Sequence, residues 1–273
     1  MKIDKCSICP RKCNADRDLR EGFCKAPWEP VIASVMAHRG EEQIISGRRG
    51  SGTVFFAGCN LGCVFCQNYD ISQQCYGDTV STNELSDIFM KLERDGVHNI
   101  NLVTPSHFTD SIAEAIKLAK EKGIKIPFVY NSNGYDSSEA LRSMDGLIDI
   151  YMPDFKYVNN SNGYRYSGVP DYFTVASQAL REMYRQAGEP IIRNGIMQKG
   201  LLIRHLVMPG LTEDSFAVLS WIKANLLNVR VNLMDQYRPE YRASEFDEIN
   251  RRLTHSEFFT VDEHFRRLEL RSD

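Results

Sequence analysis

The cysteines of this chain are confined to one end, and their placement constrains the fold more than any other feature. All eight lie within the first 75 residues: Cys6, Cys9, Cys13, Cys24, Cys59, Cys63, Cys66 and Cys75. The opening residues, MKIDKCSICPRKC, carry charges where a secretion signal has an apolar stretch, so we expect a cytoplasmic protein. Cysteines in that compartment bind metals more often than they form disulfides.

From about residue 50 the chain alternates short apolar runs with segments of helical periodicity. Continuous apolar strands separated by helices are typical of a parallel sheet that is buried on both faces. The predicted strands cover 53–57, 100–103, 126–130, 147–152, 201–207 and 229–234. Predicted helices follow a capping box at Ser81 to Glu84, a cap at Thr109 and a start at Thr212, with weaker patterns over 136–144 and 171–187.

These six strand–helix units are fewer than the eight of a closed TIM barrel. The pattern alone leaves two α/β architectures open, a partial barrel and an open doubly wound sheet. In both, ligands bind at the C-terminal ends of the strands. We expect three parts: a Cys-rich metal-binding segment over 1–48, a core over 49–240 and a helical tail over 241–273.

A cysteine triplet directly follows the first of these strands. Cys59, Cys63 and Cys66 have the spacing C-x3-C-x2-C. A structural zinc site needs four ligands, whereas three thiolates on a four-iron cluster leave one iron free to bind a small molecule and pass it an electron. Gly58 lets the loop bend tightly around a bulky cluster. The alternatives are a zinc site completed by Cys75 and a set of reduced buried thiols.

The triplet, with the aromatic Phe65 before its last cysteine, resembles the signature of the radical S-adenosylmethionine (SAM) enzymes, in particular the branch related to pyruvate formate-lyase activating enzyme. The resemblance covers about residues 50 to 240 and implies a partial (β/α)6 TIM-like barrel. It implies a [4Fe–4S] cluster whose open iron binds SAM through its amino and carboxylate groups. Reductive cleavage of SAM then yields a 5′-deoxyadenosyl radical, which abstracts a hydrogen atom from a substrate, so the resemblance implies an oxidoreductase.

Polar residues at later strand ends match the same family. Asn131-Ser132-Asn133-Gly134 aligns with an Asp-Thr-Asn-Gly stretch, and Lys156 ends an Asp-Phe-Lys that matches Asp-Leu-Lys. Arg204 stands where the family has a SAM-binding arginine. The resemblance therefore implies that Asn131, Asn133, Lys156 and Arg204 bind SAM. From the residues alone, Asn-Gly is also a turn signal, and Arg204 could form a structural salt bridge within the barrel.

Two strand ends depart from the family pattern. After the second strand, residues 104–107 replace a Gly-Gly-Glu stretch that receives the amino group of SAM, which leaves Thr104 or backbone carbonyls for that contact. His107 is either an acid–base group or a surface or capping residue. After the sixth strand, Gln236 or Tyr237 takes the place of a histidine that contacts the adenosyl group. The loop over 157–170 is predicted to be a substrate lid, a partner contact or an ordinary surface loop.

A second set of cysteines precedes the barrel, and two kinds of metal site compete for it. A closed zinc knuckle would stabilise a segment of ~25 residues that has little core of its own. An auxiliary iron–sulfur cluster would instead store or relay electrons. Arg11 and Arg17 place cations near the thiolates, and the pattern resembles a subgroup of activating-enzyme homologues. The four cysteines of this set are Cys6, Cys9, Cys13 and Cys24.

These observations predict a radical SAM enzyme that acts on a protein glycine, as activases do, or on a small molecule or another peptide. A non-enzymatic metal-binding adaptor is the third hypothesis, but it would leave Lys156 and Arg204 unexplained. We expect a reductant such as flavodoxin or ferredoxin and, for an activase, a protein substrate. The net charge of −3 argues against a nucleic-acid partner. No apolar run reaches the ~18 residues of a membrane helix.

Overall fold

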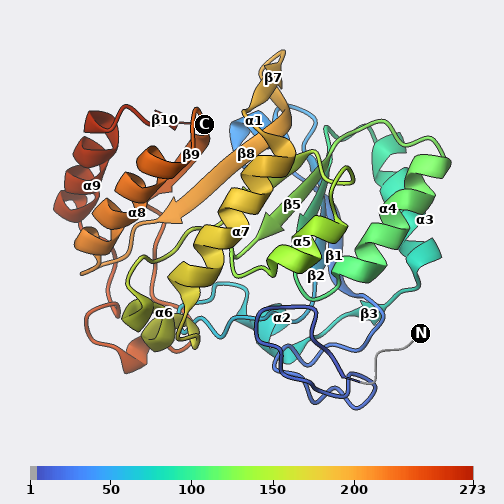
Figure 1. Cartoon of the computed structure of the whole chain (residues 1–273), viewed down its shortest axis with the longest axis horizontal. Helices are drawn as coiled ribbons and strands as arrows, with labels where there is room; N and C mark the ends of the chain where they lie inside the picture. The colour runs from blue at the N-terminus through green and yellow to red at the C-terminus, as the bar shows by residue number, and fades with distance from the viewer. Residues whose placement is uncertain (1–4, 273) are drawn as a thin grey trace.

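The structure is a computed structural model that describes residues 5–272, and one mostly parallel sheet forms its centre (Figure 1). The strand order is β10-β9-β8-β6-β5-β4-β2-β1-β3, and β7 pairs with β8 away from this path. Neighbouring strands from β2 to β9 pair in parallel. These six strands are β2 (Ser51–Phe56), β4 (Ile100–Val103), β5 (Phe128–Ser132), β6 (Ile150–Pro153), β8 (Ile196–Leu206) and β9 (Arg230–Met234).

The six parallel strands are the six that the apolar runs predict, with ends that differ by a few residues. The sheet does not close on itself, because β3 and β10 are its two edges within the described residues. The architecture is therefore the predicted partial TIM-like barrel. The strands that were not predicted lie at the margins: β1 (Val31–His38) and β3 (Asp78–Thr79), both antiparallel, the hairpin strand β7 (Ile191–Arg193) and β10 (Arg271–Ser272).

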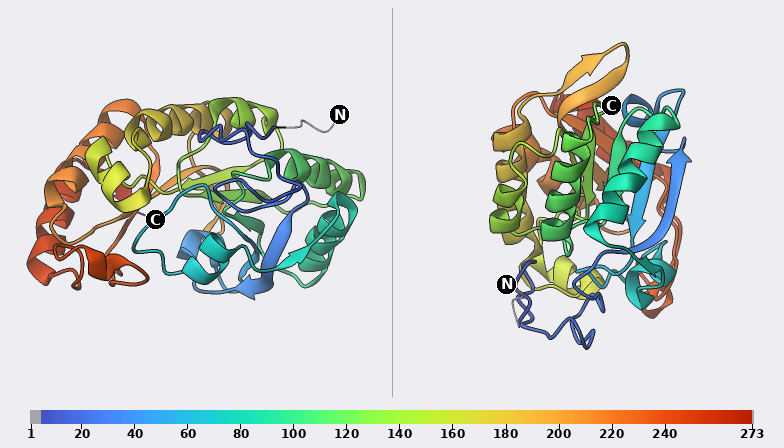
Figure 2. Two further views of the ribbon diagram at one scale, coloured as in Figure 1. Left: turned by 90° about the horizontal axis from the view of Figure 1, so that it is seen from below. Right: turned by 90° about the vertical axis from the view of Figure 1, so that its right-hand side faces the viewer.

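Five helices form an arc along the outer face of the sheet, which Figure 2 shows from below. They are α3 (Thr82–Arg94), α4 (Thr109–Glu121), α5 (Ser138–Ser143), α7 (Tyr172–Ala187) and α8 (Thr212–Asn225). The others are α1 (Gln43–Ser46), α2 (Tyr69–Gln74), α6 (Asn160–Ser167), α9 (His255–Arg267) and a short 3-10 turn, η1 (Ala243–Glu245). None of the helices in the described part of the chain is long and apolar enough to span a bilayer.

The helix starts agree with the sequence signals in two cases and not in a third. Ser81 and Glu84 form the predicted capping box of α3. Thr109 does not cap α4, because Phe108 occupies the N-cap position and the buried Thr109 hydroxyl has no hydrogen-bond partner in the described structure. Thr212 is the first residue of α8, which confirms the predicted start. Thr109 does not act as the cap because its side chain is buried in the core.

The sequence predicts a loop over 157–170, and this prediction is wrong because the segment contains helix α6. Asn159 caps the helix by accepting a hydrogen bond from the Ser161 N–H at 2.9 Å. Gly168 ends it in the left-handed conformation, with φ of +68°. The helix was missed because its asparagines and glycine resemble turn residues.

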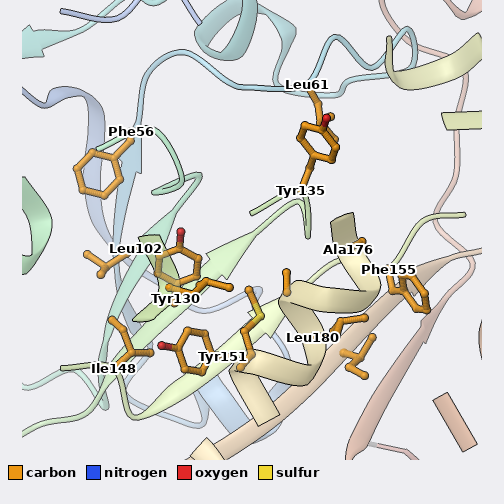
Figure 3. Packing of buried hydrophobic residues seen from close by; sticks show 14 of the residues in the cluster. Phe56, Leu61, Leu102, Tyr130, Tyr135, Ile148, Tyr151, Phe155, Ala176 and Leu180 are labelled. Carbon is orange, nitrogen blue, oxygen red and sulfur yellow. The ribbon is translucent and has the colours of Figure 1, made fainter. Parts of the chain in front are cut away.

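The two faces of the sheet differ, and this difference positions the site. The outer face packs against the helices around Tyr130, Tyr151 and Leu102 (Figure 3). On the inner face a small apolar cluster that includes Ile45 of α1 and Val129 of β5 lies at the N-terminal side of the strands. Successive side chains along a strand point to opposite faces, so Val129 and Asn131 of β5 both lie on the inner face. The inner face therefore changes from apolar to polar toward the C-terminal ends of the strands.

Candidate functional site

The cysteine triplet lies on the loop that leaves the C-terminal end of β2. Gly58 begins this loop with φ of +81°, a conformation that favours glycine. Helix α6 holds the loop through two backbone hydrogen bonds, from the Gly62 N–H to the Ser167 oxygen at 3.1 Å and from the Val64 N–H to the Tyr166 oxygen at 2.9 Å. The segment predicted as a loop thus supports the triplet, and nothing in the sequence marks Ser167 or Tyr166 for this role.

Each thiol of the triplet has a polar neighbour. The Cys59 sulfur accepts hydrogen bonds from the Leu61 N–H at 3.4 Å and the Asn133 amide at 3.3 Å. The Cys63 sulfur lies 3.1 Å from the Ser167 hydroxyl, and the Cys66 sulfur lies 3.3 Å from the Ser72 hydroxyl. Burial raises the pKa of Cys59 to about 12, so its thiol stays protonated until a metal displaces the proton.

A pocket of about 280 Å³ separates the triplet from the C-terminal ends of the neighbouring strands. All seven residues assigned to cluster and SAM binding from the sequence line this single pocket: Cys59, Cys63, Cys66, Asn131, Asn133, Lys156 and Arg204. Further residues line the pocket, among which Ser132, Asp154, Gln236 and Thr104 are polar and Leu61, Phe65, Val103, Leu206 and Met234 are apolar. The pocket therefore has a polar wall at the C-terminal ends of β5, β6 and β8, and its remainder mixes the apolar side chains with Gln67, Asn68 and Ser72.

Asp154 organises the cations of the polar wall. Its carboxylate accepts hydrogen bonds from Lys156 Nζ at 2.6 Å and Arg204 Nε at 2.9 Å. Burial opposes its charge, but the neighbouring cations Arg204 and Lys156 outweigh burial and lower the pKa of Asp154. Arg204 also donates to the Asn131 side-chain oxygen at 2.8 Å. Asp154 therefore holds both cations of this wall in fixed positions.

A pair of glutamates that sequence reasoning missed lies behind Arg204. Glu41 accepts a hydrogen bond from Asn131 at 3.3 Å and lies 3.7 Å from the Arg204 guanidinium. Glu42 lies 4.0 Å from the same guanidinium. Burial raises the pKa of Glu41, against the opposing effect of Arg204. The only signal in the sequence is the Glu-Glu pair itself, just before α1.

The structure separates the two candidates named after the sixth strand. Gln236 lines the pocket. Tyr237 instead donates its hydroxyl to the Ile249 oxygen at 2.8 Å and packs against Phe65 with 5.9 Å between ring centroids. Its place is therefore structural, behind the aromatic residue of the triplet.

The two candidates after the second strand also separate. Thr104 lines the pocket and has φ of +61°, an uncommon conformation for a β-branched residue. His107 is neither a surface residue nor part of this pocket lining, because it is buried with Nε2 2.9 Å from the Ala57 oxygen. Burial lowers its pKa to about 3, so the imidazole is neutral.

The second set of cysteines also converges. Cys6, Cys9, Cys13 and Cys24 line a separate, narrow pocket of about 10 Å³ together with Arg11, Asn60 and His107, among others. Cys75, considered as a fourth ligand for the triplet, is absent from the lining of the triplet pocket and lies across Gly58 on the side of Cys24. The eight cysteines are all free thiols.

The donor set of the triplet pocket fits a cluster and a zwitterionic ligand. Three thiols lie on one loop, and the facing wall offers two cations, a carboxylate and amides. Within residues 5–272, no group of three or more His, Cys, Asp or Glu side chains could hold a single metal ion as placed. A single ion needs its ligands gathered around one point, whereas a [4Fe–4S] cluster distributes its thiolates over separate irons.

Comparisons with known proteins agree with this geometry. The family model described as the radical SAM superfamily matches residues 53–220. The uncharacterized protein MJ0674 of Methanocaldococcus jannaschii is 37% identical over 262 residues, which cover 92% of this chain and 71% of that protein.

Similar solved structures share the fold at low sequence identity. Streptococcus suis SuiB bound to S-adenosylmethionine has a TM-score of 0.56 and 12% identity over 80% of this chain, which spans only 48% of SuiB. A radical SAM methyltransferase from Sphaerobacter thermophilus also has a TM-score of 0.56 and 12% identity, over 81% of this chain and 65% of the methyltransferase. Such likeness supports the barrel architecture alone.

Proposed function

Because this chain belongs to the radical SAM superfamily, we propose that Cys59, Cys63 and Cys66 hold its [4Fe–4S] cluster and that the adjacent pocket binds SAM. One observation carries the proposal: the predicted ligands come from four separate segments of the chain, and all of them line one pocket. When bound, cluster and SAM together supply a 5′-deoxyadenosyl radical that removes a hydrogen atom from a substrate.

The residues of the polar wall would bind and orient SAM. Lys156 and Arg204 carry the positive charge that a carboxylate requires, and Asp154 holds both side chains in place. Asn131 and Asn133 offer amide groups that can both donate and accept, which suits ribose hydroxyls. Thr104 is the candidate acceptor for the ammonium group.

The apolar lining would exclude water from the reactive region. Leu61 and Phe65 lie on the triplet loop itself, while Leu206 and Met234 approach from the ends of β8 and β9. A radical that meets no water or stray side chain reacts only with the substrate held beside it. The pocket thus combines a polar binding wall with a protected volume.

Substrate identity is a further part of the proposal. Following the resemblance to the activating enzymes, we propose an activase that takes hydrogen from a glycine of a partner protein, with flavodoxin or ferredoxin as reductant. A glycyl-radical signal in the partner after incubation would support this. Cleavage of SAM with no such signal in any plausible partner would favour a small molecule or another peptide.

The triplet proposal is tested by anaerobic reconstitution with iron and sulfide, reduction in the presence of SAM, and assay of 5′-deoxyadenosine. Cys63→Ala should abolish the product, because the cluster loses one of its three protein ligands. Cys75→Ala is the matched control and should keep it, since Cys75 does not line the pocket. A normal yield from Cys63→Ala would remove the triplet from catalysis, and zinc in both cysteine sites would favour the adaptor hypothesis.

A further inference from the structure

The second set of cysteines has an environment that needs a negative charge. Arg17 is buried, with only 1% of its surface exposed. Its Nη1 donates to the His107 oxygen at 2.7 Å and lies 4.0 Å from the Cys6 sulfur, while Nη2 has no hydrogen-bond partner. Among residues 5–272, no carboxylate forms a salt bridge with it. A buried guanidinium without a counter-charge is strongly unfavourable.

A second buried group at this pocket also has an unused polar atom. His107 lines the pocket and is 1% exposed. Its Nε2 faces the Ala57 carbonyl at 2.9 Å and must therefore carry the proton, which leaves a lone pair on Nδ1. Nδ1 has no partner in the described structure. Four thiolates around a metal centre would supply the negative charge for Arg17, and metal or cluster ligation is the chemistry suited to this collection of donors.

The two cysteine pockets are lined by consecutive residues of the same loop. Asn60 lines the second pocket, while its neighbours Cys59 and Leu61 line the first. Arg11, which also lines the second pocket, donates from Nε to the Asn60 oxygen at 2.5 Å.

The contact continues to the triplet itself. The Asn60 side-chain oxygen accepts from Asn133 at 2.7 Å, and the same Asn133 amide donates to the Cys59 sulfur at 3.3 Å. A Cβ atom at Gly58 would come within 2.5 Å of the Cys24 oxygen, so the two segments touch directly there as well.

We propose that Cys6, Cys9, Cys13 and Cys24 hold an auxiliary iron–sulfur cluster that passes electrons to the triplet site past Asn60. This inference rests on the proposed function, because the electron acceptor is the cluster that we propose at the triplet. A one-electron carrier protein of the flavodoxin or ferredoxin class is oxidised by one electron as the auxiliary cluster is reduced. That electron then moves to the triplet cluster, and the auxiliary cluster returns to its oxidised state. A zinc knuckle would leave the contact without a redox role, because zinc does not change its oxidation state.

The metal is identified in a variant that retains only the second site. Cys59, Cys63 and Cys66 are replaced together by Ser, and the protein is reconstituted without oxygen. It should hold about four irons and four sulfides per chain, against about eight of each in the wild type, with an EPR signal of its own on reduction. One zinc without iron, or no metal, overturns the proposal. Cys75→Ser in the wild-type background should keep all the iron.

The relay is tested by stopped-flow reduction of the triplet cluster. Arg11→Gln keeps every cysteine and should retain about eight irons, yet reduction by flavodoxin should be about tenfold slower. The Cys9→Ser/Cys24→Ser variant should show the same slowing with about four irons, while dithionite reduces it normally. Unchanged rates with flavodoxin in both variants overturn the relay. A wild type that holds both clusters but makes no 5′-deoxyadenosine contradicts the proposed function and leaves the second site standing.

Discussion

At the scale of single residues, the site depends on one carboxylate that holds two cations. The side chains of Asp154, Lys156 and Arg204 are between 13% and 18% exposed, so their charges are only weakly screened by water. Such a group is sensitive to loss of one partner, because removal leaves the others charged and mostly buried.

We predict that Asp154→Asn lowers the free energy of unfolding by about 2–4 kcal/mol, because Lys156 loses its counter-charge and Arg204 loses the nearest of its three carboxylates. Urea unfolding of the metal-free protein measures this. Asp95→Asn is the control: it breaks an ion pair with Lys91 in which both side chains are well exposed, and it should cost less than about 0.5 kcal/mol. A loss of stability in Asp154→Asn as small as that in the control would contradict the prediction.

Thr104 stores backbone strain at the edge of the pocket. A left-handed conformation costs an ordinary residue about 1–2 kcal/mol, and glycine avoids this cost. Glycine also gives the unfolded chain more conformational entropy, which offsets part of the stabilisation. Thr104→Gly should therefore raise the free energy of unfolding by about 0.5–1 kcal/mol. Thr104→Ala should not raise it, because alanine keeps the strain. Thermal unfolding of both variants checks this, and a less stable glycine variant would contradict it.

At the scale of elements, the least predictable segments are those that support the site from outside the βα pattern. Helix α6 has the composition of a loop, yet it holds the triplet loop through Ser167 and Tyr166. The Glu41–Glu42 pair precedes α1, a helix of four residues that is too short for a periodic signal. A local sequence pattern shows helical periodicity and turn residues. Helix α6 and the segment of Glu41 and Glu42 lack a clear pattern of this kind, because tertiary contacts stabilise them.

The C-terminal helix α9 offers a test of stability that is independent of metal. Glu257 accepts hydrogen bonds from Arg251 at 2.7 Å, from the Thr254 N–H at 3.0 Å and from the Gly210 N–H at 2.8 Å. Chiefly through Arg251, these contacts lower the pKa of Glu257. A lowered carboxyl pKa adds stability above the unfolded value of about 4.3, and that stability is lost as the pH falls toward the folded value.

Glu257→Gln should accordingly cost about 1–2 kcal/mol at pH 7, and the difference from the wild type should shrink as the pH falls below about 4. Chemical unfolding across this pH range provides the measurement. Glu263→Gln, on the same helix, removes an exposed partner that lies 3.7 Å from Arg267 and should change little at any pH. A Glu257→Gln deficit that is constant with pH would contradict the linkage.

At the scale of the whole molecule, the sequence predicts the parallel strands of the βα units. It also predicts, in outline, that the candidate ligands meet at one edge of the sheet. The six parallel strands have a strong signal because both of their faces are buried, and their C-terminal ends share one edge. That geometry alone brings Asn131, Lys156 and Arg204 opposite the triplet. The contact between the two cysteine sets was not predictable, because it depends on how the irregular N-terminal segment packs against Gly58.

The central claim is that the triplet leaves one iron of its cluster for SAM. A crystal structure of the reconstituted protein with SAM, determined without oxygen, tests this most directly. The account predicts three protein thiolates, from Cys59, Cys63 and Cys66, and the amino and carboxylate groups of SAM on the fourth iron. A fourth protein side chain on that iron, from Cys75 or any other residue, would contradict it.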